Sequence, residues 1–124
     1  TGSRKQMLRV LEEHKFLGLA SDQNAGSHGV AIPFFNKLVP TPKGAALFHR
    51  KTGMPIIVGF CILSKDLKYN LTLRVMETSH ISKDKLEAIV DINTLFSEIL
   101  ENEVKLFPEQ YFWYHRKWSR TLYK

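Results

Sequence analysis

The sequence is poor in the features that build disulfide frameworks, metal centres and membrane spans. Its 124 residues contain one cysteine, Cys61, which excludes an internal disulfide and an all-cysteine zinc site. The longest apolar run, residues 55–63, is far shorter than the roughly 20 residues that cross a bilayer. The five histidines lack metal-ligand spacing, apart from His80 and Asp84 at a predicted helix start, and no Gly-rich phosphate loop occurs. The sequence therefore predicts neither a metal nor a cofactor.

Negative charge is scarce at the end of the chain. The protein has 18 Lys and Arg against 12 Asp and Glu, a net charge of +6, and its last eleven residues contain four cations and no acid. Such a basic, aromatic terminus predicts an anionic partner, which could be the phosphates of a membrane surface, a phosphorylated ligand or nucleic acid. Charge alone does not choose among the three.

Hydrophobic periodicity and capping residues predict alternating helices and strands. We expect helices over 3–14, from Thr41 to Gly53, and from a Ser82 cap to 107, and strands over 16–20, 30–35, 55–63 and 69–75. Pro33 restricts the strand over 30–35 to an edge. The fold class predicted is α/β: one unit over 1–124 with a mixed, mainly parallel sheet flanked by helices, because a strand–helix–strand connection favours a parallel pair.

The run over 55–63 is apolar enough for a strand that is buried on both faces. A sheet of three strands, the last of which is residues 69–75 joined by a hairpin, is too small to cover such an apolar strand. We therefore expect additional cover, either further strands or a second copy of the chain. A homo-oligomer that forms through an exposed sheet edge is one outcome, and we interpret the chain as a fragment.

A polar loop follows the predicted strand over 16–20. It contains Asp22, Gln23, Asn24 and His28, at the carboxyl end of a strand, where α/β proteins gather ligand sites. The alternative is an Asx-type turn whose glycines supply positive φ and which binds nothing. Residue types leave both interpretations open.

The densest aromatic stretch, residues 111–118, has three interpretations. Its rings could be core residues, or a belt at a membrane surface beside the neighbouring Arg and Lys. The third interpretation, stacking on single-stranded nucleic acid, is disfavoured because such sites spread their aromatics over a sheet or groove.

Four segments carry a resemblance to a known family. Asp-Gln-Asn-Ala-Gly at 22–26, Val-Ala-Ile-Pro-Phe-Phe at 30–35 and Lys-Thr-Gly-Met-Pro-Ile-Ile at 51–57 precede Pro-Glu-Gln-Tyr-Phe-Trp-Tyr-His-Arg-Lys-Trp at 108–118. In order and spacing, from about residue 4 to residue 120, the chain resembles the carboxyl-terminal half of the lipid A biosynthesis acyltransferases. These are the lauroyl and myristoyl transferases of bacterial lipopolysaccharide.

The resemblance implies a glycerolipid-acyltransferase-like fold and an enzyme that moves an acyl chain onto a hydroxyl of a lipid A precursor. The donor would be acyl carrier protein or acyl-CoA, and the place the cytoplasmic face of the bacterial inner membrane. The family uses a His-x4-Asp/Glu pair as its general base, but no histidine here has an acid five residues later. We therefore expect the carboxyl-terminal part of a larger acyltransferase domain, which is inactive alone.

The resemblance also assigns binding roles. Asp22 and Gln23 match a loop that helps to hold the acceptor, with Asn24 and His28 beside them, and residues 55–57 resemble the apolar motif that supports the acyl site. The cations predicted to bind anionic headgroups of the membrane are Arg116, Lys117 and Arg120. The alternative function is a non-catalytic module that binds anionic lipid headgroups, or nucleic acid, through the basic aromatic end.

Overall fold

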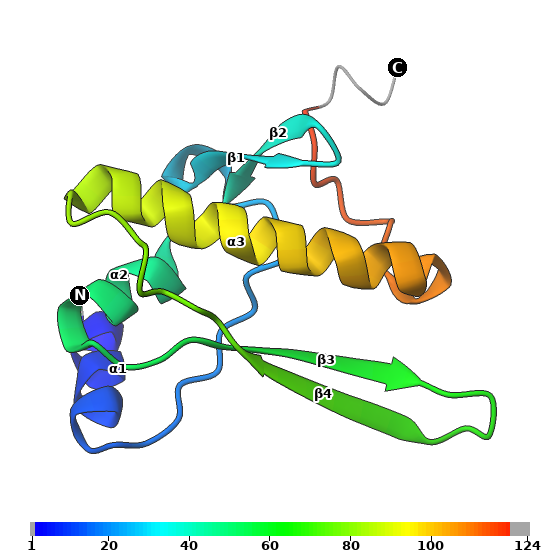
Figure 1. Cartoon of the computed structure of the whole chain (residues 1–124), viewed down its shortest axis with the longest axis horizontal. Helices are drawn as coiled ribbons and strands as arrows, with labels where there is room; N and C mark the ends of the chain where they lie inside the picture. The colour runs from blue at the N-terminus through cyan, green and yellow to red at the C-terminus, as the bar shows by residue number, and fades with distance from the viewer. Residues whose placement is uncertain (1, 120–124) are drawn as a thin grey trace.

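Two hairpins pack on a long carboxyl-terminal helix. The computed structural model describes residues 2–119. In Figure 1 the long helix α3 extends across the molecule, with one hairpin on either side of it and α1 and α2 near its amino end. The elements are α1 (Gly2–Glu12), η1 (Gly26–His28), β1 (Val30–Phe34), β2 (Lys37–Thr41), α2 (Gly44–Thr52), β3 (Ile57–Leu63), β4 (Tyr69–Val75), α3 (Lys85–Leu106) and η2 (Pro108–Gln110).

The predicted sheet is wrong. The described residues form two antiparallel two-stranded sheets, β1–β2 and β3–β4, and not one mainly parallel sheet flanked by helices. The error comes from the connection through α2, which leaves β2 in one sheet and enters β3 in the other. A strand–helix–strand sequence favours a parallel pair only when both strands belong to the same sheet.

The β1–β2 hairpin could not be predicted from the sequence because its turn residues are atypical. Phe35 and Asn36 both have positive φ, 48° and 58°, and phenylalanine rarely adopts this conformation. Tertiary contacts hold it there. The Phe35 N–H donates to Oε1 of Glu101 on α3 at 2.7 Å, and the Phe35 ring meets the Phe34 ring edge-on, with 4.7 Å between ring centroids.

Glycine is required beside this hairpin. A Cβ on Gly29 would lie 2.7 Å from the carbonyl carbon of Pro40 on β2, so no other residue fits without a backbone shift. The N–H of Ala25 also donates to the Pro40 carbonyl at 2.8 Å. Together these contacts hold the end of the polar loop against β2.

The strand predicted over 16–20 is absent. Residues 15–21 have no regular secondary structure, and the Phe16 side chain is 92% exposed. An apolar run forms a strand only when a neighbouring strand accepts and donates its backbone hydrogen bonds. The described residues place no such neighbour beside this run.

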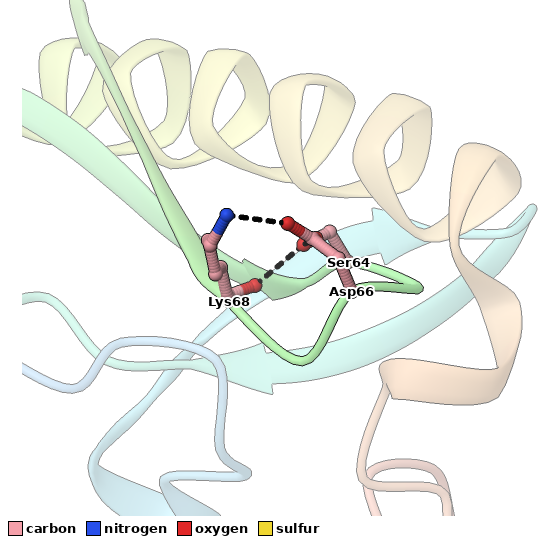
Figure 2. Close-up of polar contacts among 3 residues, drawn as sticks. All are labelled: Ser64, Asp66 and Lys68. Atoms are coloured by element: carbon pink, nitrogen blue, oxygen red, sulfur yellow. Dashed lines mark hydrogen bonds and ion pairs between the residues drawn. The ribbon is translucent and has the colours of Figure 1, made fainter.

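The hairpin predicted between the strands over 55–63 and 69–75 is confirmed as β3–β4. The strands pair antiparallel from Ile57 opposite Val75 to Leu63 opposite Tyr69. Figure 2 shows the turn, in which Ser64 Oγ donates to the Asp66 carboxylate and Lys68 Nζ lies 2.9 Å from the same carboxylate. The hydrogen bond from Ser64, and then the contact with Lys68, lower the pKa of Asp66.

The strand β3 is not buried on both faces. Within it only Val58 is buried, and Cys61, expected to be packed inside, is exposed. One face of the hairpin exposes six large apolar side chains, which we call the open apolar face: Ile57, Leu63, Tyr69, Leu71, Leu73 and Val75. The strand predicted over 69–75 is therefore present, but its apolar side chains are exposed.

The helix α3 supplies the core. It buries Ile92 and Leu100 in two clusters, one with Ala46, Val58, Met76 and Ile89, the other with Phe34, Val39 and Val104. The predicted Ser82 cap is displaced to Asp84, whose carboxylate accepts the N–H groups of Leu86 and Glu87, so that its pKa is lowered. Gly53 ends α2 at a φ of 69°, as its position predicted.

Candidate substrate site

The polar loop is held by the far end of the chain. The Asn24 N–H donates to Nε2 of His115 at 2.8 Å, and Asn24 Nδ2 donates to the Lys117 carbonyl at the same distance. Lys117 Nζ in turn donates to the Asp22 carbonyl at 2.8 Å. We call this set of contacts among Asp22, Asn24, Tyr111, His115 and Lys117 the clasp.

Lys117 is the centre of the clasp and is 5% exposed. Its Nζ also donates to the Tyr111 hydroxyl at 3.1 Å and lies 3.9 Å from the Phe34 ring centroid, a cation–π geometry. Burial lowers the pKa of Lys117 to about 8, although the nearby Asp22 carboxylate raises it in part. The ammonium that was predicted to bind lipid headgroups is thus engaged by the protein.

The other predicted binding residues are distributed differently. Gln23 lies between two clasp residues and is exposed, and Arg116 is exposed next to Lys117. His28 is exposed in η1, and within residues 2–119 no hydrogen bond joins its side chain to the clasp. Arg120 lies outside the described residues. The structure thus brings Asp22, Gln23 and Asn24 to Lys117, but not His28.

An Asx turn shapes the loop beyond the clasp. Asn24 Oδ1 accepts the Gly26 N–H at 2.7 Å, and Gly26 has a φ of 56°, which suits glycine. The turn foreseen in the sequence is therefore present, together with long-range contacts that the sequence could not indicate.

Sequence reasoning missed His115 and Tyr111 as loop contacts. His115 lies 91 residues from Asn24 in sequence, and its neighbours form only an aromatic-basic run. The interpretation of the rings as core was right for Tyr111 and Trp118, which pack on the cluster of Phe34. Phe112 and Tyr114, by contrast, are 64% and 92% exposed.

An apolar cavity of about 420 Å³ adjoins the clasp. The segment 17–22, α2, β3 and α3 line it together, and both Asp22 and Tyr111 belong to the clasp and to the cavity wall. Residues 55–57, which the resemblance linked to the acyl site, also line it. A cavity of this size falls within the range of about 300–1,000 Å³ that is usual for small-molecule sites.

Most residues of the cavity wall are apolar, and the two polar side chains that are fully buried in it, Asn93 and Glu103, have partners within the protein. Asn93 is 3% exposed and donates from Nδ2 to the Ile89 carbonyl at 2.8 Å, and Glu103 Oε2 lies 3.4 Å from Arg74 Nη2. Both groups are already paired within the protein, so they add little affinity for a polar ligand. The wall therefore favours an aliphatic ligand.

The chemistry that the described residues can supply is limited. Within residues 2–119 no histidine forms an ion pair with a carboxylate, and no three His, Cys, Asp or Glu side chains lie close enough to hold a metal ion. No helix in the same range combines the length and apolar character needed to cross a membrane. The described residues thus form an apolar cavity beside a loop of hydrogen-bonding groups.

Comparison with known proteins identifies the family. No curated protein matches the chain. The family described as bacterial lipid A biosynthesis acyltransferase, however, matches residues 2–120, and this range includes the loop, the cavity walls and the end of the clasp. The chain thus belongs to the bacterial lipid A biosynthesis acyltransferase family.

Proposed function

We propose that this chain forms the substrate-holding, carboxyl-terminal part of a larger acyltransferase domain. The domain transfers a fatty acyl chain from acyl carrier protein, or acyl-CoA, to a hydroxyl of a lipid A precursor. The family match over residues 2–120 carries this proposal. The cavity beside the loop supports it, because an acyl chain needs an apolar channel and the hydroxyl acceptor needs polar groups near the channel mouth.

In this proposal the cavity takes the acyl chain and the exposed side of the loop meets the acceptor. Gln23 and the carboxylate of Asp22 provide hydrogen-bonding groups, with Asn24 fixed behind them by the clasp. We assign His28, Arg116 and Arg120, from the resemblance and their charge, to contacts with the acceptor or with anionic headgroups of the membrane. The proposed reaction takes place at the cytoplasmic face of the bacterial inner membrane.

The general base comes from another polypeptide segment. Acyl transfer needs a group that takes the proton from the attacking hydroxyl, and the sequence has no His-x4-Asp/Glu pair. The open apolar face supports this interpretation, since a soluble monomer rarely exposes so many large apolar side chains together. Further polypeptide, or a second copy of the chain, would cover them.

The single cysteine offers a direct test. Cys61 is exposed, lies opposite Leu71 in the β3–β4 hairpin and is among the residues that line the cavity. Lauroyl-CoA bound along this part of β3 should slow its alkylation by a water-soluble maleimide severalfold, whereas CoA without an acyl chain should not. In the same mixture with a lipid A precursor, the chain should transfer no acyl group by itself.

Two results would contradict the proposal. Equal alkylation rates with lauroyl-CoA and CoA would show that the acyl chain does not bind in the cavity. Acyl transfer by the purified chain alone would show that a base within this sequence suffices. Tight binding of nucleic acid or of simple anionic vesicles, without protection of Cys61, would favour the alternative binding module.

A further inference from the structure

The clasp joins the polar loop to the carboxyl-terminal segment of the described chain. Its three hydrogen bonds with the loop connect residues that are 91 to 95 positions apart, so it forms only when the chain has folded. It fixes both the backbone carbonyl of Asp22 and the backbone N–H of Asn24, which flank Gln23. The conformation of the loop is therefore set by the carboxyl-terminal segment and not by the loop alone.

The His115 ring holds the loop backbone directly. Its Nε2 accepts the Asn24 N–H at 2.8 Å, through the lone pair of an unprotonated ring nitrogen. This bond fixes the backbone on the carboxyl side of Gln23.

Lys117 supplies the second contact with the loop. Its Nζ donates to the Asp22 carbonyl at 2.8 Å and to the Tyr111 hydroxyl at 3.1 Å, and it lies 3.9 Å from the centroid of the Phe34 ring. Because Lys117 is 5% exposed and meets three partners, its side chain holds the Asp22 carbonyl in one place.

We infer that His115 and Lys117 are positioning residues that hold the acceptor loop over residues 22–24. This inference rests on the proposed function in one respect, the role of the loop in binding the acceptor. Neither residue touches the reacting atoms: both act through Asp22 and Asn24.

The test compares four variants with the unaltered chain by amide hydrogen exchange at Asn24. His115→Phe removes the acceptor, and Lys117→Met removes the ammonium with little change in volume. Each should raise the exchange rate about two- to tenfold, the range expected when one net hydrogen bond is lost. Lys105→Met is the matched control, because Lys105 also lies near a phenylalanine ring, with Nζ 5.8 Å from the Phe35 centroid, but outside the clasp.

The fourth variant separates positioning from simple support. His115→Gln keeps an oxygen acceptor for the Asn24 N–H, so it should retain slow exchange at Asn24 where His115→Phe does not. This pair of variants keeps the test decisive if Lys117→Met does not fold.

Binding of a lipid A precursor in detergent micelles is the second readout. His115→Phe and Lys117→Met should weaken it severalfold, and His115→Gln should restore it at neutral pH. Unchanged hydrogen exchange at Asn24 in His115→Phe and Lys117→Met would show that the clasp does not hold the loop. Faster exchange with unchanged binding would overturn its positioning role. If the unaltered chain bound no precursor, the proposed function would fail, while the exchange rates would still decide whether the clasp holds the loop.

Discussion

At the scale of single residues, Lys117 shows how position changes chemistry. Its neighbour Arg116 is exposed, whereas Lys117 is enclosed by Phe34, Tyr111 and the Asp22 carbonyl. The sequence places two cations side by side and cannot tell which is buried. The difference follows from contacts with residues about 95 positions away, which no local pattern contains.

The lowered pKa of Lys117 predicts how stability depends on pH. The ordinary pKa of 10.5 describes the unfolded chain, and the folded pKa is about 8. Between these values the unfolded chain binds more protons, so the free energy of unfolding should rise with pH. The gain is at most about 3 kcal/mol, since one pKa unit corresponds to about 1.4 kcal/mol and solvent screening reduces it.

Urea denaturation at pH 7.5 and pH 10 measures this dependence. The difference between the two pH values should be smaller in Lys117→Met than in the unaltered chain, whereas Lys105→Met should keep it. An identical pH difference in all three proteins would mean that Lys117 is not buried as a charged group.

At the scale of elements, the long helix was predicted well and its neighbours less so. The existence of α1, α2, α3 and the β3–β4 hairpin followed from periodicity and turn residues, because these signals are local. The β1–β2 hairpin was missed because Phe35 adopts positive φ only with support from Glu101 on α3. The loop residues 22–24 were foreseen as a candidate site, but their partners His115 and Tyr111 were not.

The apolar stripe of α3 separates into buried and exposed positions. Ile89 and Leu86 are three positions apart on this helix, yet Ile89 is 5% exposed and Leu86 is 72% exposed. Ile89→Ala should lower the free energy of unfolding by about 2–5 kcal/mol, because it leaves a cavity in the core. Leu86→Ala should change it by less than about 0.5 kcal/mol.

Chemical denaturation of the two variants beside the unaltered chain gives both values. Because each change shortens an apolar side chain to alanine on the same helix, helix propensity affects both similarly. Equal destabilisation would show that Leu86 is covered in solution.

At the scale of the whole molecule, the open apolar face dominates the surface. Leu71 and Leu73 are 66% and 61% exposed at the centre of this face, and isolated sheets of two strands are seldom stable in water without cover. We therefore expect the purified chain to self-associate through this face.

Light scattering over a range of protein concentrations tests this expectation. The molar mass should rise with concentration, and the double variant Leu71→Thr, Leu73→Thr should remain monomeric while keeping residues that favour strands. Leu38→Thr is the control, because Leu38 is 65% exposed on the other hairpin. If the unaltered chain stayed monomeric at high concentration, the expected self-association through the open apolar face would be contradicted.

Gln110 sets a boundary for any such association. Its side-chain amide donates to the Leu63 carbonyl at 2.9 Å and accepts the Leu63 N–H at 2.8 Å, as the backbone of an adjacent strand would. The N–H and carbonyl of Leu63 lie at the edge of β3 that faces away from β4. An additional strand at this edge could not bond to Leu63 and could pair only with residues 57–61. The side chain of Gln110 therefore limits how far the sheet can be extended.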